Sequence, residues 1–273
     1  MLLNILDKVE SLPPLPQTVN EIEIFRKKDD KEVEELTKII EKDPLCVVTL
    51  LKISNSSLFG FSSRIETIRR VINLLGMNFA IYVTLKESIN NILKTDLCPY
   101  NVKCEDFLEI SNLSLSLVNL WVSQIDKKLE EEILLASLLQ EIGKFILSEI
   151  INKEGKTEEF KKKIDSGIEI KEVEKGFLNT TTSEVTAQIF RHWKFNENLV
   201  SMIECVDDID SCTCENRMKS QILDVVKTVC NISNPLSENS IAKGLAKAKK
   251  YGFELEYLNN SIKLLKNRFE LNK

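Results

Sequence analysis

The sequence predicts an all-α fold, and two observations carry this prediction. Glycine and proline, which interrupt helices, are scarce, with 8 Gly and 6 Pro among 273 residues. Nearly every segment repeats its apolar residues at helical spacing, and no segment alternates apolar and polar residues between hairpin turns. Because no fixed period recurs along the chain, we expect a compact helical bundle and not an array of repeats.

The first predicted helices follow a stiff entry segment. Pro13 and Pro16 favour an extended start. Helices are then predicted over residues 17–28 and 31–42, each with an apolar face at helical spacing. The aspartates at positions 29–30 offer a cap for the second of these helices.

The next helix has the clearest start signal in the chain. Asp43 supplies a capping carboxylate, and Pro44 is well tolerated at the first helical position. Residues 45–53 are apolar almost all round, so we expect this helix to be central and buried. Asn55 and Ser56 can hydrogen-bond the backbone of the loop that follows.

Helical periodicity continues to the end of the chain. Residues 64–76 predict an amphipathic helix that ends at Gly76, after Leu75. The segment 130–151 begins with acidic residues and is otherwise nearly all apolar, so we expect it to be central. The remaining predicted helices lie at 77–94, 106–126, a charged pair within 156–176, 180–193, 195–206, 216–232, 238–251 and 254–270, with a polar interruption at 207–216.

Composition excludes several classes of protein. No run approaches the ~18 apolar residues of a membrane-spanning helix. The Cys count of 7, an odd number without a recognisable signal peptide, predicts reduced thiols and a cytoplasmic location. The net charge of −5 disfavours nucleic acid as a partner, although residues 217–273 carry 11 Lys and Arg against 5 Asp and Glu. We interpret these basic residues as solvated helix faces.

Residues 12–76 contain a series of spaced motifs: LPPLP, then IIEKDPLCVVTLLKISNSS, then IETI and LLG. This series resembles the HDOD domain family, the HD-related output domains of bacterial signalling proteins. The matching positions are Leu12, Pro13, Leu15, Pro16, Ile40, Asp43, Pro44, Leu45, Leu50, Leu51, Asn55, Ser56, Ile65, Thr67, Ile68, Leu75 and Gly76.

The resemblance implies an N-terminal helical subdomain packed on an HD-domain-like helical core. It covers residues 5–207, divided into an N-terminal helical part at 12–95 and the HD-like core at 104–207. Residues 208–273 form a C-terminal helical extension, about which the family pattern says least.

The second half of the family resembles the helical core of HD-type phosphohydrolases, in which a His-Asp pair binds metal. The sequence LLQEIGK at 138–144 places Gln140 and Glu141 at those two positions. Thr182 and Asp207 stand at or beside later positions where such relatives carry histidine. The only histidine of the chain, His192, matches none of these positions. We interpret it as a partly exposed packing residue.

The resemblance therefore implies a vestigial pocket, with Gln140, Glu141, Lys144, Thr182 and Asp207 as its candidate residues. Loss of the imidazoles removes most of the affinity for a transition metal. We accordingly predict no catalytic residue, no metal and no cofactor. Two alternatives remain open: a metal-dependent phosphohydrolase with a carboxylate-only Mg²⁺ or Mn²⁺ site, and a small-molecule sensor, for a nucleotide, that uses the pocket.

A second cluster of possible ligands lies at residues 205–214. Cys205, Cys212 and Cys214 stand among aspartates, but no CxxC pair is present. We interpret the segment as a polar loop with incidental thiols. The function implied by the family is that of a non-catalytic regulatory or scaffold protein in bacterial signal transduction, which acts by protein–protein interaction on unidentified signalling proteins.

Overall fold

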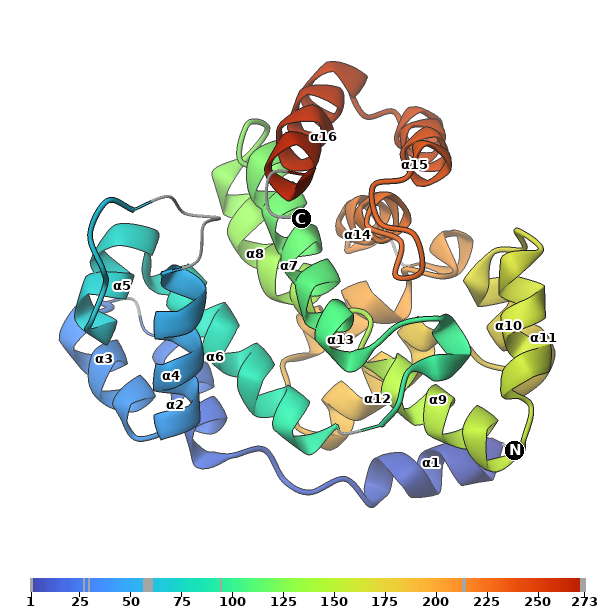
Figure 1. Ribbon diagram of the computed structural model, residues 1–273, viewed down its shortest axis with the longest axis horizontal. Helices are drawn as coiled ribbons and strands as arrows, with labels where there is room; N and C mark the ends of the chain where they lie inside the picture. Colours follow the sequence, from blue (N-terminus) through green and yellow to red (C-terminus); the bar gives the residue numbers. More distant parts are fainter. Residues whose placement is uncertain are drawn as a thin grey trace. The chain divides into compact units, whose positions relative to one another are not determined.

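The structure is a computed structural model that describes residues 2–26, 28, 30–55, 61–93, 95–212 and 215–270, and all regular structure in these ranges is helical (Figure 1). The all-α prediction is confirmed. The first helices are α1 (Leu2–Glu10), α2 (Gln17–Arg26), α3 (Val33–Glu41), α4 (Pro44–Ser54), α5 (Ile68–Leu75) and α6 (Met77–Ile92). They are followed by η1 (Cys98–Tyr100), α7 (Cys104–Val122), α8 (Lys127–Leu139), α9 (Gly143–Lys153), α10 (Thr157–Asp165) and α11 (Ile170–Leu178). The last are α12 (Thr182–His192), α13 (Glu197–Glu204), η2 (Ile209–Ser211), α14 (Arg217–Val229), α15 (Glu238–Lys250) and α16 (Leu255–Glu270).

The chain divides into two compact units. The first comprises Met1–Leu12 and Lys94–Asn267, and the second comprises Pro13–Leu93 and Arg268–Lys273. The helices after residue 207 therefore belong to the same unit as α7 to α13. None of the helices in the described ranges combines the length and the apolar character that a bilayer-spanning segment requires.

The start of the second unit follows the sequence predictions. Residues 13–16 carry no regular structure, and α2 buries Val19, Ile22 and Phe25 completely. The Asp43 carboxylate accepts hydrogen bonds from the N–H groups of Leu45 and Cys46 at 3.0 and 3.2 Å, and Pro44 is the first residue of α4. The predicted helix start at this point is confirmed.

Two predictions for the second unit are wrong. Helix α3 begins at Val33, so Glu32 and not Asp30 is its N-cap residue, and the Glu32 side chain makes no capping hydrogen bond. Asp29 lies outside the described residues. Helix α4 is not central: Leu45 and Val48 are 60% and 63% exposed. The helix packs against α3, α5 and α6 with one face only, so its apolar composition on the other face does not correspond to burial.

The Asn55 side chain holds the loop after α4 by hydrogen-bonding both backbone groups of Ile65. Asn55 accepts a hydrogen bond from the Ile65 N–H and donates one to the Ile65 carbonyl, both at 2.8 Å. The predicted role of Asn55 is confirmed, whereas Ser56 lies outside the described residues. Gly76 ends α5 with a φ of +91°, a conformation that favours glycine, and α6 begins directly after it.

The first unit is built on paired helices. Helix α7 lies beside α8, α12 beside both α9 and α13, and α14 beside α15 (Figure 1). The segment 130–151 is buried as predicted, but it forms two helices, α8 and α9, with a turn at residues 140–142 between them. This turn positions the candidate site.

Candidate functional site

The turn between α8 and α9 packs closely against the N-terminal end of α12. The Gly143 N–H donates to Thr186 Oγ1 at 3.0 Å. A Cβ atom on Gly143 would lie 2.5 Å from the carbonyl oxygen of Thr182, so a larger residue would force the two segments apart. Glycine at this position therefore sets the spacing between the turn and α12.

Lys144, one residue into α9, is completely buried and points its ammonium group into a set of acceptors. Its Nζ lies 2.8 Å from Glu141 Oε2, 3.2 Å from Glu174 Oε1 and 2.8 Å from Thr182 Oγ1. It also lies 4.8 Å from the centre of the Tyr100 ring, whose hydroxyl donates to Glu174 at 3.0 Å. A buried ammonium needs such partners, because its desolvation is otherwise very costly.

Lys227 of α14 provides a second ammonium group next to the first. Its Nζ lies 2.9 Å from each carboxylate oxygen of Asp207 and 3.4 Å from Glu141 Oε1. Glu141 therefore lies between two lysines and pairs with both.

The N-terminus of α12 supplies the remaining donors. The Thr182 N–H donates to Glu174 Oε2 at 2.7 Å, and the Ser183 N–H donates to Asp207 Oδ2 at 3.1 Å. These N–H groups have no partner within the helix, and the helix dipole places partial positive charge at this end. The helix terminus thus stabilises two buried carboxylates at once.

The pKa values in this cluster follow from its charge pairs. Burial alone would raise the pKa of Asp207, but the Lys227 ammonium and the Ser183 hydroxyl hold it well below its ordinary value. Burial likewise opposes ionisation of Glu141, and Lys144 and Lys227 together lower its pKa. Burial alone would lower the pKa of Lys227, but Asp207 and Glu141 outweigh it and raise that pKa. Asp207, Glu141 and Lys227 are therefore charged at neutral pH.

The donor set does not fit the divalent metal that HD-type phosphohydrolases use. The three carboxylates, Glu141, Glu174 and Asp207, already face the two ammonium groups, which would repel a metal cation at close range. Across the described ranges, no three His, Cys, Asp or Glu side chains gather in an arrangement that could hold a metal ion. The cluster carries its own cations in the form of lysines.

Four of the five predicted pocket residues come together here: Glu141, Lys144, Thr182 and Asp207. Gln140 does not join them. Its side chain is 1% exposed, and its amide forms no hydrogen bond with any described residue.

Sequence reasoning missed Glu174, Lys227, Tyr100 and Ser183. A signal for two of them exists, because Glu174 lies four residues before the buried Leu178, and Lys227 lies four residues after the buried Leu223. A charged residue on an apolar helix face indicates a buried partner of opposite charge.

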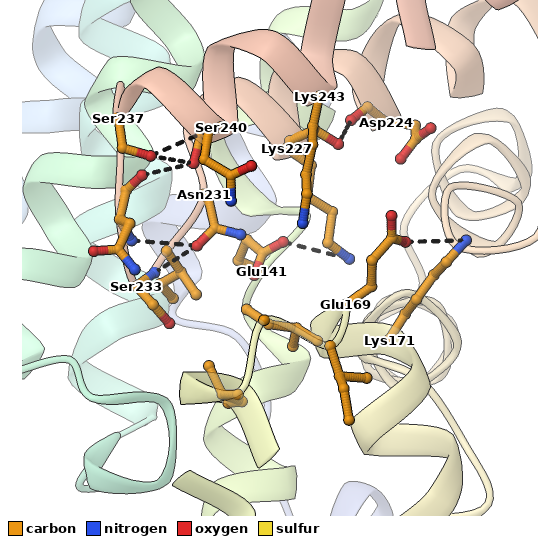
Figure 2. Close-up of a pocket in the computed structure, with 18 of the residues that line it drawn as sticks. Glu141, Glu169, Lys171, Asp224, Lys227, Asn231, Ser233, Ser237, Ser240 and Lys243 are labelled. Carbon is orange, nitrogen blue, oxygen red and sulfur yellow. Dashed lines mark hydrogen bonds and ion pairs between the residues drawn. The ribbon is translucent and has the colours of Figure 1, made fainter. Parts of the chain in front are cut away.

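A cavity of about 470 Å³ lies beside the cluster (Figure 2). Glu141, Lys144, Asp207 and Lys227 are among the residues that line it. The other walls come from the loop between α10 and α11, from α14 and from α15. The charged cluster is therefore one wall of a space large enough for a small molecule.

His192 takes no part in this site. It is half-buried at the end of α12, and its Nε2 lies 3.1 Å from the carbonyl oxygen of Leu12. The prediction of a partly exposed packing histidine is confirmed. Cys212 is buried with its Sγ 3.7 Å from Ser220 Oγ, and Cys214 lies outside the described residues.

A match to a protein-family model identifies the family of this chain. The model of the HDOD domain family matches residues 12–209, well over half of the chain. This chain belongs to the HDOD domain family. The resemblance seen in the motifs is confirmed, and the match includes the turn at residues 140–142, α12 and Asp207.

Solved structures show the same fold as this HDOD protein. A virulence factor of Campylobacter jejuni subsp. jejuni is 26% identical, with a TM-score of 0.56, and the match covers 98% of this chain and 95% of that one. A putative phosphohydrolase from Shewanella amazonensis is 19% identical, with a TM-score of 0.67 and coverage of 97% and 93%. A putative signal transduction protein from Marinobacter aquaeolei is 16% identical, with a TM-score of 0.72 and coverage of 95% and 58%. No protein of curated function matches the sequence.

We predict that Lys227→Met lowers the free energy of unfolding by about 3–5 kcal/mol, because it leaves buried carboxylates without their cation. Lys219→Met is the matched control: Lys219 is on the same helix, and its ion pair with Glu132 is partly exposed, so we expect at most about 1 kcal/mol. Urea denaturation measures both. Adding Asp207→Asn to Lys227→Met should recover part of the loss, and a double variant less stable than the single one would contradict this account.

We also predict a specific loss of stability in acid. Because the pKa of Asp207 is lower in the folded protein than in the unfolded chain, its carboxylate stabilises the fold above a pH of about 4, the ordinary value for Asp. This contribution disappears as the pH falls towards the folded pKa, with a slope of up to about 1.4 kcal/mol per pH unit. Asp207→Asn should flatten the acid limb of the stability curve, whereas Asp208→Asn, at an exposed neighbouring residue, should follow the wild type.

Proposed function

We propose that this HDOD protein is a non-catalytic regulatory protein of bacterial signal transduction, located in the cytoplasm, that acts through contacts with other proteins. One observation carries the non-catalytic part of the proposal: Lys144 and Lys227 neutralise the carboxylates that a hydrolase of HD type would use. The signalling part rests on the family and on the Marinobacter aquaeolei protein of the same fold, which is described as a putative signal transduction protein.

The chemistry of the cluster supports this proposal. Hydrolysis of a phosphate ester needs a Lewis acid or a base that activates water. The carboxylates of Glu141 and Asp207 have lowered pKa values, which makes them weak bases near neutral pH. The only imidazole, His192, lies outside the cluster.

A role in protein contacts is supported by the outer face of α4. Leu45 and Val48 on this face are 60% and 63% exposed. Adjacent exposed apolar side chains on one helix are typical of surfaces that another protein covers. The proposed partner is a signalling protein that binds this face.

The purified protein should contain no stoichiometric metal and should not hydrolyse nucleotides or phosphodiesters above background with Mg²⁺ or Mn²⁺ added. Metal analysis by mass spectrometry and a hydrolysis screen measure this. The opposite outcome, a bound metal with turnover that is lost in Glu141→Ala and kept in Glu197→Ala, at an exposed glutamate, would establish the metal-dependent phosphohydrolase instead.

Affinity capture from the native cell tests the contact function. Val48→Glu places a charge on the exposed apolar face of α4, and Asn73→Glu places the same charge at an exposed position of α5. We expect proteins that are captured by the wild type and by Asn73→Glu to be lost with Val48→Glu. Identical sets of captured proteins for all three would refute a role for this face, provided that circular dichroism shows both variants folded.

A further inference from the structure

The cavity of the first unit is lined by two donor side chains, on α15 and in the segment after α14, that have no acceptor among the described residues. Lys243 of α15 is exposed to the cavity and makes no hydrogen bond or ion pair with any residue that the structure describes. In Figure 2 the side chains of Lys243 and Lys227 extend into the same space, between Glu141 and Glu169. An ammonium group in such a position is free to bind an anion.

Asn231 adds a second free donor. Its Oδ1 atom accepts the N–H groups of Ser233 and Asn234 at 3.0 and 3.2 Å. This fixes the orientation of the amide, so that Nδ2 is turned away from the loop and towards the cavity (Figure 2). Nδ2 has no acceptor in the described part of the chain, so it is available to a ligand oxygen.

The acids of the cavity are, by contrast, already paired. Asp207 and Glu141 face Lys227 at 2.9 and 3.4 Å. Asp224 accepts from Lys247 at 2.7 Å and from the Tyr251 hydroxyl at 2.6 Å.

At the mouth of the cavity the acids are also paired. Glu169 lies 3.8 Å from Lys171, and Asp165 accepts from the Asn101 amide at 3.0 Å. The lining holds equal numbers of acidic and basic side chains, and among these charged groups only Lys243 has no partner in the described part of the chain. The cavity is therefore complementary to a ligand rich in acceptor oxygens.

Four isoleucines form an apolar part of the wall, and the remaining uncharged lining residues are mostly serines, asparagines and a threonine. Ile164, Ile168 and Ile170 come from the segment around the α10–α11 loop, and Ile232 follows α14. A ligand that fills about 470 Å³ therefore presents an anionic group to Lys243 and Asn231 and an organic part to these isoleucines.

We propose that this cavity is a binding site for a small organic phosphate. The phosphate oxygens accept hydrogen bonds from Lys243 Nζ and Asn231 Nδ2, and Lys227 adds a nearby positive charge. The isoleucine wall contacts the organic part. The existence of the site does not depend on the proposed function, whereas a role for the ligand as an input signal rests on it.

The test uses the full chain with three probes: AMP, adenosine and inorganic phosphate. Isothermal titration calorimetry measures the affinities, and thermal denaturation detects weak binding as a rise in Tm. We expect AMP to bind, inorganic phosphate to bind more weakly and adenosine to give no measurable binding. Lys243→Ala should weaken AMP binding about tenfold or more. Lys249→Ala, at an exposed lysine of the same helix outside the cavity, should bind like the wild type.

Asn231→Asp is a second, sharper variant. It keeps the oxygen that accepts from Ser233 and Asn234, so the loop is retained, but it replaces the free donor by a negative charge. We expect this variant to lose AMP binding while its Tm without ligand stays near that of the wild type.

Three outcomes would overturn the proposal: no change in Tm with millimolar AMP or phosphate, adenosine binding as well as AMP, or equal affinities for the wild type and Lys243→Ala. None of these readouts involves another protein, so a failure here is distinct from a failure of the capture experiment.

Discussion

The first unit depends on one constraint, which is that its buried carboxylates must be compensated inside the protein. Glu174 and Asp207 receive the free N–H groups of α12, and Lys144 and Lys227 supply full positive charges. An uncompensated charge at such depth would cost several kcal/mol, a large fraction of the stability of a typical domain. The relative positions of α9, α11, α12 and α14 are therefore linked, since each contributes a group to the same cluster.

The proposed non-catalytic function of this HDOD protein rests on the same constraint. In a metal site, a metal ion would balance the carboxylates and activate water, whereas in this cluster two lysines balance them. The charges of the cluster are thus balanced by side chains of α9 and α14. The adjacent cavity offers the unpaired donors of Lys243 and Asn231, which lie beyond the residues of the family match.

The helical content and most of the helix boundaries could be predicted from the sequence because their signals are local. Asp43 before Pro44, the glycine at 76 and the stripe of α2 each act within a few residues. The predictions were wrong where packing against another segment of the chain determines the local structure. The apolar composition of residues 45–53 could not show that α4 packs with one face only, and the run 130–151 could not show that a turn interrupts it. That turn depends on a close approach between Gly143 and α12, which lies about forty residues away in the sequence.

The sequence by itself determined the family, the helical class and the absence of histidine from the positions of the HD metal ligands, because these follow from residue identity and spacing. It also named Glu141, Lys144, Thr182 and Asp207 as residues of one pocket. Only the tertiary structure decided what these residues do there. Glu174 and Lys227 come from helices with no motif of their own, and their charges become partners of Lys144 and Asp207 only when α11 and α14 pack against α9 and α12. Charge compensation in a buried site depends on the distances between the charged groups. When these groups lie on segments that are remote in the sequence, packing sets those distances.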